Sequence, residues 1–146
     1  MNKINIFIVI LFLISATTIH AQVKNKPSSI IKTSASMKTY YDRPQLETMQ
    51  KGELIGLYLE RARLLINTLP YIALANKPGL TMTDIGIPDT SDNRKLLETE
   101  HESSSTFLIS TSDFLSQMLP YSDKSSLITS ILFYENVLRN LHVMNE

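Results

Sequence analysis

The spacing of side chains between residues 91 and 119 restricts the fold of this chain more than any other feature. Positions suited to one face of a helix recur at alternating intervals of four and three residues, as in the contact between coiled-coil helices. They are Leu97, His101, Ser104, Leu108, Thr111, Leu115 and Met118, and Leu96, Phe107, Phe114 and Leu119 widen the face. We predict an amphipathic helix that begins after Thr90 or Ser91, either able to cap it, and ends near Leu119.

Two further segments carry the same period. The first runs from Pro44, with Asp42 as a cap, towards Leu69 or Ala75. Gly52 and Gly56 interrupt it, which indicates either a break near Gly52 or a close approach of a neighbouring helix. The other segment runs from about residue 124 to residue 143, and its apolar face is the set Leu127, Ile131, Leu138 and Leu141.

The short Pro120–Asp123 turn joins the last two helices and favours an antiparallel hairpin. We therefore predict an all-α antiparallel bundle over residues 43–146, with three long helices, or four if Pro70 divides the first.

The first 21 residues have the three parts of a secretory signal peptide. Lys3 is the positive region, residues 4 to 14 are apolar apart from Asn5, and Ala21 is the small residue that favours cleavage before Gln22. The apolar run is shorter than the roughly 20 residues of a membrane-spanning helix. We predict a cleaved signal peptide over residues 1–21, a periplasmic or secreted protein, and no membrane insertion of the mature chain.

Residues 22–42 carry several serines and lysines and no helical period, which predicts a flexible polar tether. Ile30 and Ile31 are its one apolar pair and could instead form a short strand. The whole sequence contains no cysteine, so the exported protein cannot depend on disulfide bonds and must be stabilised by burial.

The charge balance excludes some classes of partner. With Lys3 removed, thirteen basic and fourteen acidic residues remain, a net charge of −1. Binding to nucleic acid or to anionic lipid would need clustered Lys and Arg. We predict neither, and expect a protein partner in the cell envelope, while the sequence leaves the oligomeric state open.

Two features are candidates for that protein contact. Residues 76–92 form a long connection with turn residues and alternating apolar positions, and long loops in compact domains are often functional. Tyr40 and Tyr41 are adjacent, so their side chains cannot both face one core. The predicted partner-binding residues are Tyr40, Tyr41, Leu80, Met82, Ile85 and Ile87.

Glu98 and His101 raise the question of a metal site, since a Glu-x-x-His pair is half of a carboxylate-bridged di-metal centre in helical bundles. A second pair is missing, because Arg139 stands three residues before His142. Arg94, four residues before Glu98, can account for that carboxylate as a surface ion pair. We predict no metal and no cofactor, and keep a small-ligand or metal-binding bundle centred on Glu98 and His101 as the alternative.

Catalytic patterns are missing as well. There is no G-x-S-x-G nucleophile elbow, no C-x-x-C-H haem attachment and no glycine-rich phosphate loop. The sequence therefore predicts an exported, non-catalytic helical-bundle interaction protein, an adaptor or accessory subunit of a cell-envelope assembly.

Overall fold

The computed structural model of the chain describes residues 27–34, 37, 39–75 and 77–143. This part of the chain is all-α, as predicted, and contains no named β-strand. Its α-helices are α2 (Arg43–Thr48), α3 (Lys51–Ile66), α4 (Ser91–Met118) and α5 (Lys124–Val143). Three short 3₁₀ turns connect them, η1 (Leu69–Tyr71), η2 (Thr83–Ile85) and η3 (Leu119–Tyr121). The predicted signal peptide lies outside the described residues.

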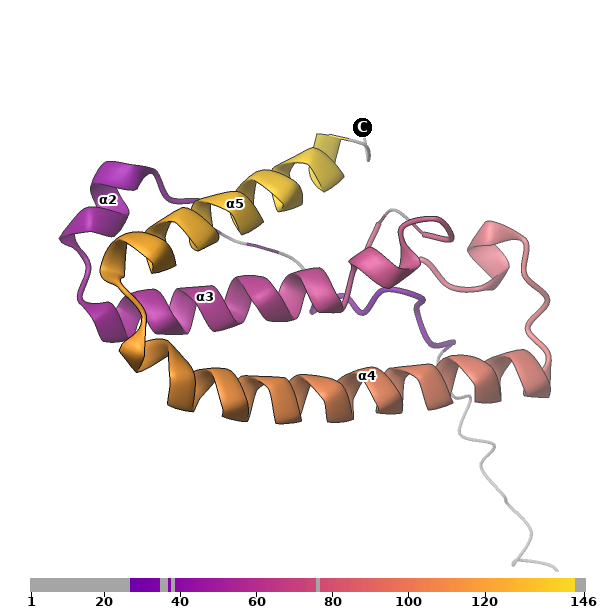
Figure 1. Cartoon of the computed structure of the whole chain (residues 1–146). Helices are drawn as coiled ribbons and strands as arrows, with labels where there is room; N and C mark the ends of the chain where they lie inside the picture. Colours follow the sequence, from indigo (N-terminus) through magenta and orange to yellow (C-terminus); the bar gives the residue numbers. More distant parts are fainter. Residues whose placement is uncertain (1–26, 35–36, 38, 76, 144–146) are drawn as a thin grey trace, which may run out of the picture.

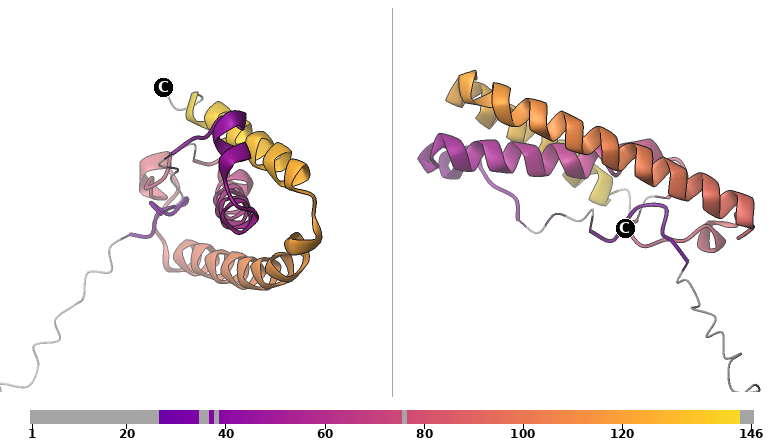
Figure 2. Two further views of the ribbon diagram at one scale, coloured as in Figure 1. Left: turned by 90° about the vertical axis from the view of Figure 1, so that its left-hand side faces the viewer. Right: turned by 90° about the horizontal axis from the view of Figure 1, so that it is seen from below.

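Helix α3 lies between α4 and α5 and packs against both (Figure 1). α4 runs antiparallel to α3, and α5 returns in nearly the direction of α3 (Figure 1). α4 and α5 share the turn η3 but then follow different sides of α3 (Figure 2). Among the described residues these two helices form no extensive contact. The predicted hairpin packing between them is therefore not what the structure shows, and each helix uses α3 as its partner instead.

The first predicted helix is divided, but not at Pro70. α2 begins with a capping box in which Asp42 Oδ1 accepts from the Gln45 amide and Gln45 Oε1 accepts from the Asp42 amide, both at 2.9 Å. The break comes at residues 49–50, where Glu53 accepts from the Gln50 amide at 2.7 Å and starts α3. Pro70 instead lies in η1, beyond the end of α3.

The glycines of α3 do not mark a close helix crossing. A methyl group built on Gly52 or Gly56 would meet no described atom within 4 Å. Of the two explanations that the sequence offered, a break near Gly52 is the one that fits, and it falls just before this residue.

Most of the core lies where α2, α3 and α5 meet. The largest cluster of buried side chains there is Leu46, Leu54, Leu119, Leu127, Ile128 and Ile131. A smaller cluster, Leu64, Leu65 and Leu138, continues it towards the far end of α3. Both lie between α3 and α5, so burial of apolar surface at this junction is the main source of stability.

Within the predicted tether, the apolar pair Ile30 and Ile31 packs into the core. Ile30 and Ile31 are buried at 3% and 0% exposure, in a core cluster with Tyr71, Met82 and Leu97. Their backbone pairs with the 76–92 loop, since the Ile30 amide donates to Leu80 O at 2.8 Å and the Gly79 amide to Ile31 O at 2.9 Å. Burial of these two isoleucine side chains stabilises the packed arrangement, although most residues around them in the sequence are polar.

Within the described part of the chain, no helix combines the length and hydrophobicity that a membrane crossing requires.

Candidate docking groove

Helix α4 buries little of its apolar surface. Of its 28 residues, only Leu97 is buried. The main positions of the predicted face are at least half-covered by α3 and the N-terminal segment, but most of the residues that widen it are exposed. The exposed fractions are 69% for Leu96, 57% for Phe107 and 61% for Phe114, while Met118, the last of the main positions, is 45% exposed. α5 would have to pack against α4 to cover them, and it does not.

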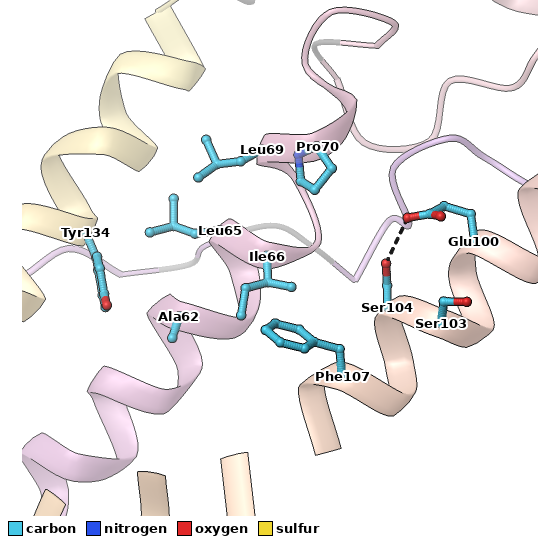
Figure 3. Close-up of a pocket in the computed structure, with 10 residues that line it drawn as sticks. All are labelled: Ala62, Leu65, Ile66, Leu69, Pro70, Glu100, Ser103, Ser104, Phe107 and Tyr134. Carbon is cyan, nitrogen blue, oxygen red and sulfur yellow. Dashed lines mark hydrogen bonds between the residues drawn. The ribbon is translucent and has the colours of Figure 1, made fainter. Parts of the chain in front are cut away.

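Of these exposed side chains, Phe107 lines an apolar groove over the C-terminal half of α3 (Figure 3). The groove has a volume of about 600 Å³, with α3 and η1 as its floor, α4 as one wall and Tyr134 of α5 on the other side. Phe107 points from α4 towards Ile66 across the floor (Figure 3). The residues that line it are Ala62, Leu65, Ile66, Leu69, Pro70, Glu100, Ser103, Ser104, Phe107 and Tyr134.

The groove has a single charged residue in its lining, Glu100, at the end near η1. A network of hydroxyls surrounds this carboxylate. Ser104 Oγ and Tyr71 Oη each donate to Glu100 Oε1 at 3.4 Å, and the two hydroxyls lie 3.1 Å apart. The remaining lining is apolar or neutral, so the groove favours an apolar occupant over a charged one.

The α5 side is fixed by two tyrosines. The hydroxyls of Tyr58 and Tyr134 are 3.0 Å apart and their ring centroids 5.2 Å. Burial, together with the hydrogen bond to Tyr58, raises the pKa of Tyr134 to about 12. A neutral phenol therefore faces the groove from α5 at any physiological pH.

The residues predicted to bind a partner lie elsewhere. Met82 is buried, and Leu80, Ile85 and Ile87 pack half-buried against the cluster that holds Ile30 and Ile31. The apolar side chains of the 76–92 loop thus face the interior. Tyr40 and Tyr41 are also half-buried, with their rings 4.4 Å from the Arg139 guanidinium and 5.7 Å from that of Arg61.

The sequence did contain a signal for the groove. The face of α4 is wider than contact with one neighbouring helix can cover, and the extra width is formed by Phe107, Phe114 and Leu96. A helix with an unusually broad apolar face requires two partners. We predicted that α5 is the second partner helix of α4. In the described structure α5 does not cover this part of α4.

Glu98 and His101 line a second, charged cavity of about 620 Å³ on another side of α4, together with Arg94 and Glu102. His101 Nε2 donates to the Ile30 carbonyl at 3.0 Å, so this nitrogen holds the N-terminal segment against α4. Throughout the described residues, no group of three or more His, Asp or Glu side chains is arranged to hold a metal ion.

No protein-family description, no curated protein and no solved structure shows significant similarity to this chain.

Proposed function

We propose that the protein is an exported, non-catalytic interaction protein, an adaptor or accessory subunit of a cell-envelope assembly, and that it binds an apolar helix of a protein partner in the groove beside α3. The observation that carries this proposal is Phe107, which is 57% exposed while it lines an apolar groove.

Apolar surface of this kind is costly to leave in water. Phe107 and Phe114 lie seven residues apart, two turns along α4, so both exposed rings lie on the same flank of the helix. Contiguous apolar patches on soluble proteins usually mark sites of protein contact. Burial of such side chains is worth about 1.5–3 kcal/mol each, which is enough for a few of them to support specific binding.

The shape of the groove favours a helix as its occupant. Its floor follows α3, and its walls come from two helices that diverge from η3. An amphipathic helix that lies in such a groove inserts side chains spaced by three, four and seven residues. It would take the place of a fourth helix and complete the bundle around α3.

The experiment is site-specific photo-crosslinking in the producing cell. Benzoylphenylalanine replaces Phe107 in the groove or, as the matched control, Asp113, which is exposed on another side of the same helix. The proposal predicts a discrete protein adduct from position 107 and none from position 113. Equal labelling from the two positions, or no adduct from position 107, would refute it.

A further inference from the structure

We infer that the helix that fills the groove is α4 of a second copy of this chain, paired antiparallel with the first about a twofold axis. This inference rests on the proposed function, because it names the occupant of the same groove.

The composition of α4 itself favours this occupant. From Ser103 to Met118 the helix carries one charged residue, Asp113, and its groove flank presents Phe107, Phe114 and Met118. Asp113 stands one residue before Phe114 and six after Phe107, which places it on a different side of the helix. The groove flank of α4 thus forms a wall of the groove in its own copy. It also presents an uncharged, apolar surface that suits the groove of a second copy. A twofold contact needs a surface complementary to itself.

Charges near the two ends of α4 also favour an antiparallel pair. Glu100 lies towards the N-terminal end of α4, in the part of the groove near η1. Lys51 lies at the other end of α3, where its Nζ donates to the Pro120 carbonyl at 2.6 Å just beyond the end of α4. An antiparallel pair of α4 helices brings Glu100 of each copy to the Lys51 end of the other. Opposite charges then meet twice, once at each end of the pair.

The register follows from these ends. If Glu100 faces the region of Pro120 in the second copy, the twofold axis passes close to Ser110, midway between them along α4. Phe107 of one copy then lies beside Phe114 of the other. Both rings, exposed in the isolated chain at 57% and 61%, become covered.

The surface available on α4 and α3 is also large enough for a dimer interface. A helix of 28 residues is about 42 Å long at 1.5 Å per residue. Helix α3, the floor of the groove, has 16 residues and is about 24 Å long. Strips about one helix diameter wide, roughly 10 Å, along the two helices cover on the order of 660 Å² on each copy and about 1,300 Å² in total, which lies within the range of stable, specific interfaces. The α4 flank and the groove are therefore large enough for a dimer.

The test uses the natural absence of cysteine. Ser110→Cys places one thiol on the groove flank, three residues after Phe107 and four before Phe114, near the proposed axis. Ser116→Cys is the matched control, because a residue two positions after Phe114 points away from that flank. Both serines are exposed, so neither change should disturb folding. Oxidation of the full protein purified from its native compartment is followed by non-reducing electrophoresis, and the unmodified protein is examined by sedimentation equilibrium.

We expect a dimer in sedimentation, and disulfide-linked dimers that form on the order of tenfold faster from Ser110→Cys than from Ser116→Cys, since a disulfide needs Cα atoms within about 7 Å. A strict monomer, or equal rates for the two variants, would overturn the dimer. The mass of the adduct from position 107 separates this failure from that of the proposed function. An adduct of twice the chain mass supports both, a reproducible adduct with a different protein overturns only the dimer, and no adduct overturns both.

Discussion

The Arg61 guanidinium and the Glu135 carboxylate form a buried ion pair that joins α3 to α5. Nη2 and Nε of Arg61 donate to Glu135 Oε1 at 3.0 and 3.2 Å, and each side chain is only 2% exposed. The same two groups hold the N-terminal segment, since Arg61 Nη2 donates to the Thr39 carbonyl at 2.7 Å and Glu135 Oε2 accepts from the Tyr41 amide at 2.9 Å. Three segments distant in sequence thus meet at one pair of charges.

Removal of one member of this pair should be strongly destabilising. Glu135→Ala leaves the Arg61 guanidinium with only the exposed Glu60 carboxylate, at 2.6 Å from Nη1, and loss of a buried partner typically costs about 3–5 kcal/mol of unfolding free energy. The control is Glu47→Ala, which breaks an exposed pair with Arg43 at 3.9 Å and should cost no more than about 1 kcal/mol. Urea denaturation measures both. Equal losses for the two variants would mean that the Arg61–Glu135 pair is not buried in solution.

The inner and outer faces of α5 should differ in the same measurement. Leu138 is 6% exposed in the core, and Leu138→Ala should cost about 2–5 kcal/mol. Phe133 on the same helix is 62% exposed, and Phe133→Ala should change stability by no more than about 0.5 kcal/mol. Leu108, half-covered on α4, should give an intermediate loss when truncated to Ala. The reverse order for Leu138 and Phe133 would place the wrong face of α5 inside.

Packing of the N-terminal segment can be tested through Ile31. This side chain is fully buried, so Ile31→Ala should also cost about 2–5 kcal/mol, whereas the neighbouring exposed Lys32→Ala should have little effect. A free polar tether would give no change for either substitution. Chemical denaturation of the two variants therefore distinguishes a packed segment from a tether.

The tyrosine pair at the groove predicts a loss of stability in alkali. The pKa of Tyr134 lies near 12 in the folded chain, above its ordinary value of 10, because burial and the hydrogen bond to Tyr58 favour the neutral phenol. This contribution is complete below pH 10 and disappears as the pH rises through 12. Burial also raises the pKa of Tyr40, so Tyr134→Phe should reduce the alkaline loss without abolishing it. An unchanged pH profile of unfolding in Tyr134→Phe would contradict this assignment.

The sequence predicted where the helices begin and end better than it predicted which helices pack together. Helix α4 begins with Thr90 as its cap and α5 begins at Lys124, as their turn residues indicate. The period of a helix identifies the face that is buried but not the element that covers it. For this reason Leu138 was placed correctly in the core, while the contact between α4 and α5 was predicted wrongly.

For the same reason, the pattern of α4 indicated a broad apolar face but not which part of that face is left uncovered. Phe107 and Leu108 are adjacent apolar residues on one predicted face, yet Leu108 is half-covered and Phe107 is exposed. The difference depends on where α3 and α5 lie relative to α4, which the helical period does not give. Likewise, the sequence pattern did not show that apolar residues of the 76–92 loop pack against Ile30 and Ile31, which are far away in sequence. Contacts between distant segments leave no local signal in the residues concerned.

The most direct test of the account is whether the groove is filled in solution. Phe107, Phe114 and Phe133 have similar exposed fractions in the isolated chain, at 57%, 61% and 62%, so hydroxyl radicals should oxidise them at similar rates if nothing is bound. Footprinting of the protein in its native compartment, read by mass spectrometry, compares the three rings directly. We predict that Phe107 and Phe114 are strongly protected relative to Phe133. Equal oxidation of all three would contradict the claim that a helix occupies the groove.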